Sequence, residues 1–109
     1  MTRPIMQKHN HFRSRKLLDA AKGQSCQNCG ANDGTVVAAH SNRGFHGKGK
    51  SIKADDCFIA WLCHRCHAWC DQGTGLDPSG VYDNPAEMWE FAHARTLKAM
   101  FDQQILKVA

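Results

Sequence analysis

The chain has 109 residues, with 14 Lys and Arg against 10 Asp and Glu and a formal net charge of +4. This length fits one small domain and excludes a multidomain assembly, since independent domains usually hold about 100 to 150 residues. Hydrophobic residues make up 42% of the chain, and no apolar run approaches the ~18 residues of a membrane span. The first 22 residues are polar and basic and do not resemble a secretory leader. We therefore expect a cytoplasmic protein that does not bind membranes.

Charge and metal-ligating residues are unevenly distributed. Residues 1–70 contain 11 Lys and Arg against 4 Asp and Glu, whereas residues 71–109 contain 3 against 6. The basic half favours a polyanionic partner such as nucleic acid, although a solvated basic surface has the same composition. Six cysteines and seven histidines are many for so short a chain. We expect them to bind metal rather than to form disulfides, because the cysteines include two Cys-x-x-Cys pairs.

The N-terminal part of the chain predicts an arm and a short helix. Residues 1–12 have no apolar periodicity and contain an early proline, so we expect a flexible basic arm. Residues 13–21 combine helix formers with Leu17 and Leu18, and Gly23 follows as a stop. A single domain is therefore expected to begin at residue 13 and to continue to residue 109.

Two short strands with a long loop between them are expected next. Residues 35–39 are β-branched and apolar and lead to His40, and residues 58–62 form a second apolar run. The intervening residues 41–56 are rich in glycine and lysine and have no helical or strand period. We expect a loop there, and loops of that length often carry function.

Two further helices are expected towards the C-terminus. One should follow the second strand and end near Gln72, because Gly73 comes next. The other is predicted over residues 85–107, since Asn84 can cap it and Pro85 suits its first turn. Its apolar residues recur every three or four positions, which predicts a core-facing stripe, with a partner-binding surface or a dimer seam as the alternative. The stripe consists of Met88, Phe91, Ala94, Leu97, Phe101, Ile105 and Val108.

The two Cys-x-x-Cys pairs carry the strongest chemical signal. Cys26 and Cys29 form the first pair and Cys63 and Cys66 the second, and 34 positions separate Cys29 from Cys63. Four thiolates make a closed tetrahedral zinc site, which supplies folding free energy in a small domain. Because a closed site has no open position, we expect this zinc to be structural and any catalysis to take place elsewhere.

The residues beside the second cysteine pair allow a second metal site. His67 and Asp71 are four residues apart on a predicted helix, so both side chains leave one face and can bind a catalytic divalent metal, Mg²⁺ or Mn²⁺. His40 would lie across from that ion as a general base. Asp56, just before the second strand, is the remaining acid within reach. Without the cysteine pairs as context, an exposed helix pair and a strand-capping histidine would explain the same residues.

The chain has a Cys-x-x-Cys pair, a strand that ends on His40, a loop, a second strand and then Cys-x-x-Cys-His-x-x-x-Asp. The order of these motifs in residues 26–72 resembles that of the HNH nucleases. More narrowly, they are similar to the YbcO-like family of small phage and prophage nucleases. The resemblance implies a zinc-stabilised α+β domain with a ββα-metal core, a short N-terminal helix and a long C-terminal helix. It implies His40 as the general base, His67 and Asp71 as the catalytic metal ligands, and Asp56 as a group that orients His40 or binds the metal.

The activity implied by the resemblance is that of a metal-dependent DNA endonuclease that hydrolyses phosphodiester bonds. A phage or prophage gene would act in the host-cell cytoplasm, in recombination or DNA processing, with a phage or host recombination protein as a further partner. The alternative is a zinc-ribbon-like DNA-binding or adaptor module without catalytic activity.

Five basic residues are candidates for binding DNA phosphates. For any one of them, loop solubility is an equally good explanation. The sequence leaves open whether the chain forms a homodimer, and it leaves open the roles of His46, Cys57 and Cys70. The five candidates are Arg43, Lys48, Lys50 and Lys53 in the loop and Arg65 in the second cysteine pair.

Overall fold

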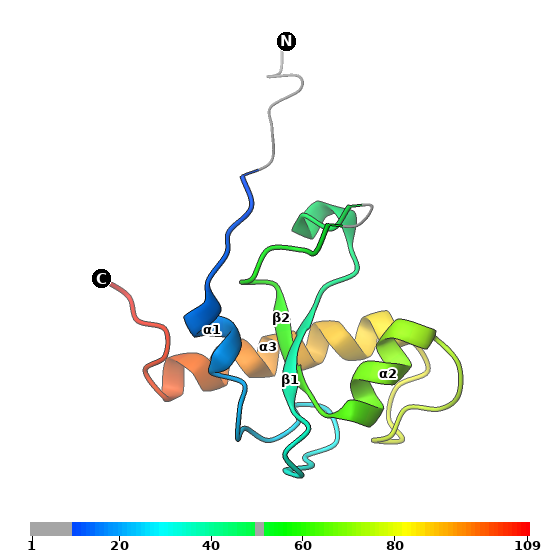
Figure 1. The fold of residues 1–109 in the computed structure, drawn as a ribbon. Coiled ribbons are helices and arrows are strands. Elements are labelled where there is room, and N and C mark those ends of the chain that lie inside the picture. Colours follow the sequence, from blue (N-terminus) through cyan, green and yellow to red (C-terminus); the bar gives the residue numbers. More distant parts are fainter. Residues whose placement is uncertain (1–9, 50–51) are drawn as a thin grey trace.

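The computed structural model describes residues 10–49 and 52–109 (Figure 1). Two antiparallel strands and several helices confirm the expected small α+β class. Within the described ranges, no helix is both long enough and apolar enough to cross a membrane. In chain order the elements are α1 (Arg15–Asp19), β1 (Val37–His40), the 3-10 turn η1 (Gly44–His46), β2 (Ile59–Leu62), α2 (His64–Gln72) and α3 (Pro85–Asp102).

The sheet consists of β1 and β2 alone, with His40 opposite Ile59. All four residues of β2 are buried, whereas β1 is buried only in part. β1 begins two residues later than the sequence predicts. The cause is a turn in which the N–H and hydroxyl of Thr35 both donate to the Asp33 carboxylate, at 3.0 and 2.6 Å.

Helix α3 supplies the packing that so small a sheet needs, because an isolated pair of strands is marginal in water. It crosses the sheet and packs mainly on β2 (Figure 1). Two of its side chains bind the strand backbone: Thr96 Oγ1 accepts from Trp61 N–H at 2.9 Å, and His93 Nδ1 donates to Ile59 O at 2.6 Å. The helix therefore satisfies backbone polar groups that burial would otherwise leave unpaired.

The core-facing side of α3 differs from the predicted stripe, which is wrong for most of its residues. Phe91 and Phe101 were expected in the core but are 50% and 44% exposed. The buried positions instead follow a spacing of four and include two small side chains, Ala92 and Thr96, which allow the helix to approach β2 closely. The residues buried along α3 are Met88, Trp89, Ala92, Thr96 and Met100.

α3 also ends at Asp102, earlier than the predicted boundary at residue 107. Gln104 adopts the left-handed conformation, with φ 60°, and stops the helix. The N–H groups of Ile105 and Leu106 both bind Met100 O, at 2.8 and 3.1 Å. The chain therefore turns back, and these two side chains pack against the core instead of extending the helix.

Replacing Thr96 by Val should destabilise the protein although the side-chain volume stays nearly the same. The change leaves Trp61 N–H buried without its partner, and an unsatisfied buried donor costs about 1 to 3 kcal/mol. Urea denaturation at a fixed zinc concentration measures the loss. Thr96→Ser keeps the hydroxyl and is the control; equal losses in the two variants would show that the hydrogen bond is not responsible.

Candidate functional site

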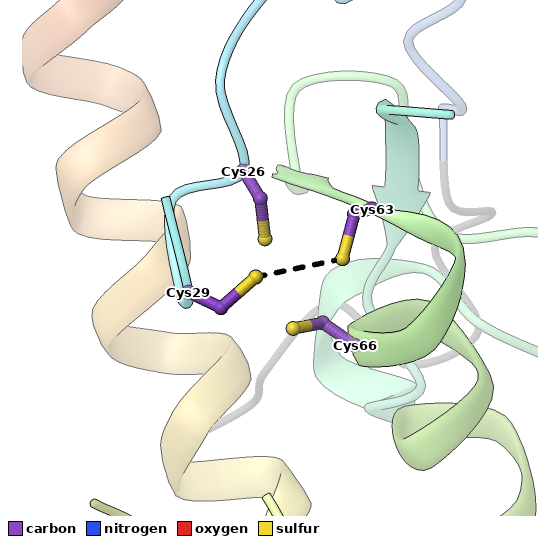
Figure 2. A group of neighbouring side chains, drawn as sticks. All are labelled: Cys26, Cys29, Cys63 and Cys66. Atoms are coloured by element: carbon purple, nitrogen blue, oxygen red, sulfur yellow. Dashed lines mark hydrogen bonds between the residues drawn. The ribbon is translucent and has the colours of Figure 1, made fainter. Parts of the chain in front are cut away.

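The four cysteines of the two Cys-x-x-Cys pairs converge on one point (Figure 2). Cys26 and Cys29 come from the turn before β1, whereas Cys63 and Cys66 come from the start of α2. The four sulfur atoms lie within 4.8 Å of one another, and the Sγ atoms of Cys29 and Cys63 are 3.6 Å apart. None of the six cysteines forms a disulfide. Four sulfur donors in so compact a group fit a structural zinc ion.

Neighbouring groups prepare this cluster for a cation. The hydrogen bond between Cys26 and Cys66 lowers the pKa of the Cys26 thiol to about 4 and raises the pKa of Cys66, so the two sulfur atoms share one proton. The thiolate is the form that binds zinc. Asn28 Nδ2 donates to Cys66 Sγ at 3.3 Å and to Asp77 Oδ1 at 2.7 Å. Burial alone would raise the pKa of Asp77, but hydrogen bonds from Ser79 and Asn28 outweigh burial and hold that pKa well below its usual range. Asn28 therefore links the cluster to an ionised carboxylate in the loop before α3.

A second group of polar side chains lies at the end of β1. His40 Nε2 is 2.8 Å from Oδ1 of Asp56, a residue that is only 4% exposed. Burial alone would raise the pKa of Asp56, but hydrogen bonds from His40 and Ser14 and the charge of Arg13 lower it. The carboxylate is therefore ionised at neutral pH. An ionised acceptor at Nε2 keeps the proton of the neutral ring on that atom and leaves the lone pair on Nδ1.

The segment before α1 binds around Asp56. Asp56 N–H donates to Phe12 O at 2.9 Å, and Ser14 N–H donates to Asp56 Oδ2 at 2.7 Å. Arg13 lies 3.4 Å from the same carboxylate and donates to two loop carbonyls at 2.6 and 2.9 Å. Ser14 also caps α1, so the helix begins at Arg15 and not at residue 13. Phe12 belongs to the predicted arm but is hydrogen-bonded to this loop, and residues 1–9 of that arm lie outside the described residues.

A cleft of about 440 Å³ contains both His40 and the predicted catalytic metal ligands. His40 lines it from β1, and His67 and Asp71 line it from α2. His67 Nε2 and Asp71 Oδ2 are 3.4 Å apart, and their side chains are 37% and 59% exposed. Lys48 and Lys53 line the same cleft. The structure thus brings together an oriented imidazole, an imidazole and carboxylate pair, and two ammonium groups.

The His67 and Asp71 pair offers two protein ligands for a metal ion. Among the described residues, the four cysteines are the only group of three or more His, Cys, Asp or Glu side chains close enough to hold an ion together. His67 and Asp71 supply one imidazole and one carboxylate on the same helix face, which are two potential donors for a divalent cation. These two residues are fewer than the four sulfur donors of the cysteine cluster.

The other candidates for DNA contact lie apart from this cleft or outside the described chain. Arg43 forms an ion pair with Glu90 of α3 at 2.8 Å. Arg65 is exposed on α2 and is not among the residues that line the cleft. Lys50 lies outside the described residues. Of the five predicted basic residues, the structure therefore places Lys48 and Lys53 beside His40.

The residues whose roles the sequence left open do not line the cleft that contains His40, His67 and Asp71. The His46 ring stacks on Phe58, with centroids 4.2 Å apart, and its Nδ1 is 2.6 Å from Ser41 Oγ. Burial lowers the pKa of His46 and favours the neutral ring. Cys70 is half-buried, which raises the pKa of its thiol to about 12, and Cys57 is exposed. Neither cysteine belongs to the four-sulfur cluster.

Three residues that organise these sites escaped the sequence analysis: Arg13, Asn28 and Asp77. The string that begins at Asp77, Asp-Pro-Ser-Gly, is a turn signal and could have predicted a carboxylate bound to its own backbone. No local pattern marks Arg13 or Asn28, because the groups they bind lie 40 and 49 positions away.

Comparison with known proteins shows a likeness to a solved structure. No family model matches the chain, and no curated protein matches it. A solved structure from Escherichia coli strain K-12, described as a “putative bacteriophage protein”, matches with a TM-score of 0.56 and 25% sequence identity. The match covers 80% of this chain and 98% of that chain. The likeness fits the expected phage or prophage association.

We expect one zinc ion per chain and a fold that depends on it. Cys66→Ala removes one of four ligands and should abolish stoichiometric zinc and strongly lower the melting temperature, because metal affinity in such sites is folding free energy. Elemental analysis and thermal denaturation measure both effects. Cys57→Ala, at an exposed thiol outside the cluster, is the matched control. Full zinc content and an unchanged melting temperature in Cys66→Ala would contradict the assignment.

Removing the Asp56 carboxylate should loosen the segment before α1. In Asp56→Ala the Ser14 amide loses a charged acceptor, and hydrogen bonds to charged groups contribute about 1.5 to 3 kcal/mol. Native-state hydrogen exchange of that amide should therefore accelerate by about tenfold or more. Asp71→Asn alters an exposed carboxylate that does not bind Ser14 and is the control. Unchanged exchange in Asp56→Ala would show that another contact holds the segment.

Proposed function

We propose that this protein is a metal-dependent DNA endonuclease of the HNH type that hydrolyses phosphodiester bonds. The observation that carries the proposal is the single cleft lined by His40, His67 and Asp71. These residues come from β1 and α2, and the order β1, β2, α2 is that of a ββα core. The likeness to a structure described as a phage protein supports action in a phage or prophage setting.

His40 serves as the general base in this proposal. Its Nδ1 carries the lone pair and accepts a proton from a water molecule in the cleft, so that the water can attack the phosphorus atom. Asp56 stays ionised, holds the ring by Nε2 at 2.8 Å and stabilises the imidazolium that forms. The burial of Asp56 strengthens this interaction, because water competes little for a carboxylate that is 4% exposed.

His67 and Asp71 hold the catalytic divalent cation, Mg²⁺ or Mn²⁺. When bound, that cation supplies Lewis-acid stabilisation of the charge that develops on the phosphate and on the leaving oxygen. The two side chains are exposed and line the cleft, so a cation held by them would be accessible to water and substrate. Lys48 and Lys53 bind the neighbouring phosphates of the DNA strand as point charges.

A DNA-binding or adaptor module without catalytic activity is the second candidate. The observation that favours it is the small number of ligands at His67 and Asp71, since no third ligand among the described residues completes a cluster with them. In this case the same basic cleft binds DNA, and His40 has a structural role through Asp56.

Nicking of supercoiled plasmid by the purified full chain tests the proposal. The wild type should cut with added Mg²⁺ or Mn²⁺ and not with EDTA. His40→Ala should stay folded and keep its structural zinc, with a somewhat lower melting temperature because the buried Asp56 carboxylate loses a donor. It should cut about 10²- to 10⁴-fold more slowly, the usual contribution of a general base. His64→Ala is the matched control, because His64 is exposed on α2 and does not line the cleft.

The outcomes separate the two candidates. Loss of cutting in His40→Ala, with wild-type rates in His64→Ala, supports the nuclease and controls for a contaminating enzyme. Equal cutting by His40→Ala and wild type would overturn the role of His40. A zinc-loaded wild type that binds DNA but cuts no supercoiled, single-stranded or branched substrate would replace the nuclease by the binding module.

A further inference from the structure

The cleft beside His40 has a wall that the proposed function does not use. Besides β1 and α2, it is lined by α1 and the turn after it, including Arg15 and Lys22. A second and more open hollow of about 580 Å³ shares Arg15, His40 and Lys53 with the first. The two hollows adjoin along these residues, and together they are here called the His40 groove.

Basic side chains from two distant parts of the sequence line the His40 groove. Arg15 and Lys22 come from the α1 region, and Lys48 and Lys53 come from the loop between the strands. The side chains of Arg15 and Lys22 are 81% and 82% exposed, and both lie 3.8 Å from the same carboxylate, Asp19. Two cations thus share one acid, and exposed ion pairs of this length contribute little to stability. A phosphate can therefore replace Asp19 as their partner at small cost.

The α1 region is held in a fixed position relative to His40 although it is short. Leu17 and Ala21 are buried in the core, at 7% and 1% exposure. At the other end, Ser14 N–H binds Oδ2 of Asp56, whose Oδ1 binds His40. One carboxylate therefore fixes the position of both the imidazole ring of the proposed base, His40, and the first residues of α1. A backbone fixed in this way holds the attachment points of Arg15 and Lys22 beside His40 before a ligand binds, so only the two side chains have to be ordered.

We propose that the α1 region is a phosphate-binding wall of the nuclease, in which Arg15 and Lys22 bind the DNA backbone together with Lys48 and Lys53, which line the same cleft. This inference rests on the proposed function for the identity of the polyanion and deepens it by naming the residues that hold the strand. The contacts are made to the backbone, so they set the position of the strand and not its sequence.

Salt dependence of DNA binding tests the wall. Each phosphate contact adds about 0.9 to the slope of log affinity against log salt for duplex DNA and about 0.7 for single strands. The double variant Arg15→Ala/Lys22→Ala should reduce the magnitude of this slope by about 1 to 2 and weaken DNA binding by about tenfold or more. The variants are made in the full zinc-loaded chain with His40→Ala to prevent cutting. Fluorescence anisotropy of labelled duplex and single-stranded oligonucleotides between about 50 and 200 mM salt is the readout.

Lys16→Ala/Lys98→Ala is the matched control. It removes the same number of charges, one of them from α1 itself, at exposed positions that do not line the His40 groove. This control should change the slope much less than Arg15→Ala/Lys22→Ala. Zinc content and melting temperature are measured for each variant, so that a loss of binding is compared only between folded chains.

The results distinguish this inference from the proposed function. Equal effects of the two double variants, or no DNA binding by the parent chain at about 50 mM salt, would overturn the wall. If binding depends on Arg15 and Lys22 but a chain with native His40 cuts no DNA, the wall stands and the nuclease fails. If Arg15→Ala/Lys22→Ala, with His40 intact, cuts at the wild-type kcat/KM, the nuclease stands and the wall fails.

Discussion

The convergence of four cysteine sulfurs within 4.8 Å is the constraint on which the rest of the molecule depends. One pair precedes β1 and the other begins α2, so bringing the pairs together closes the chain around both strands. A sheet of two four-residue strands with a small core does not hold this arrangement unaided. Because Cys63 and Cys66 fix the first turn of α2, the cluster also determines the direction in which His67 and Asp71 leave that helix.

Asp56 has the corresponding role on the other side of the candidate site. Its carboxylate receives His40 from β1 and the backbone of Ser14 from the start of α1, while Arg13 adds a positive charge. Burial disfavours the ionised carboxylate, but these donors keep its pKa low. The cysteine cluster thus positions α2, and Asp56 positions β1 and α1. The cleft lies between these two fixed points, which is why side chains from three separate elements share it.

Local signals predicted much of the fold, and long-range contacts explain what they missed. The Asn84-Pro85 start of α3 and the glycine after α2 act over a few residues, and both predicted helix boundaries are confirmed. Each Cys-x-x-Cys pair is also a local signal, and the two pairs converge on a cluster that fits the predicted zinc ion. The stripe on α3 was wrong because periodicity gives weight to large apolar residues, whereas close packing on β2 required Ala92 and Thr96. The link from Asp56 to Arg13 spans 43 positions and has no local pattern. Nuclease activity itself stays a prediction.

The hydrogen bonds between α3 and β2 also decide which edge of the sheet is open. The outward N–H of Trp61 and the outward carbonyl of Ile59 are bound by α3 side chains. By the register of the sheet, the outward backbone groups of β1 are those of Ala38 and His40, and both residues line the groove. An open strand edge invites pairing with another chain and aggregation, and nearby charges oppose it. The basic side chains that make the groove suitable for a polyanion lie beside this edge of β1. They therefore also oppose the pairing of β1 with a strand of another chain.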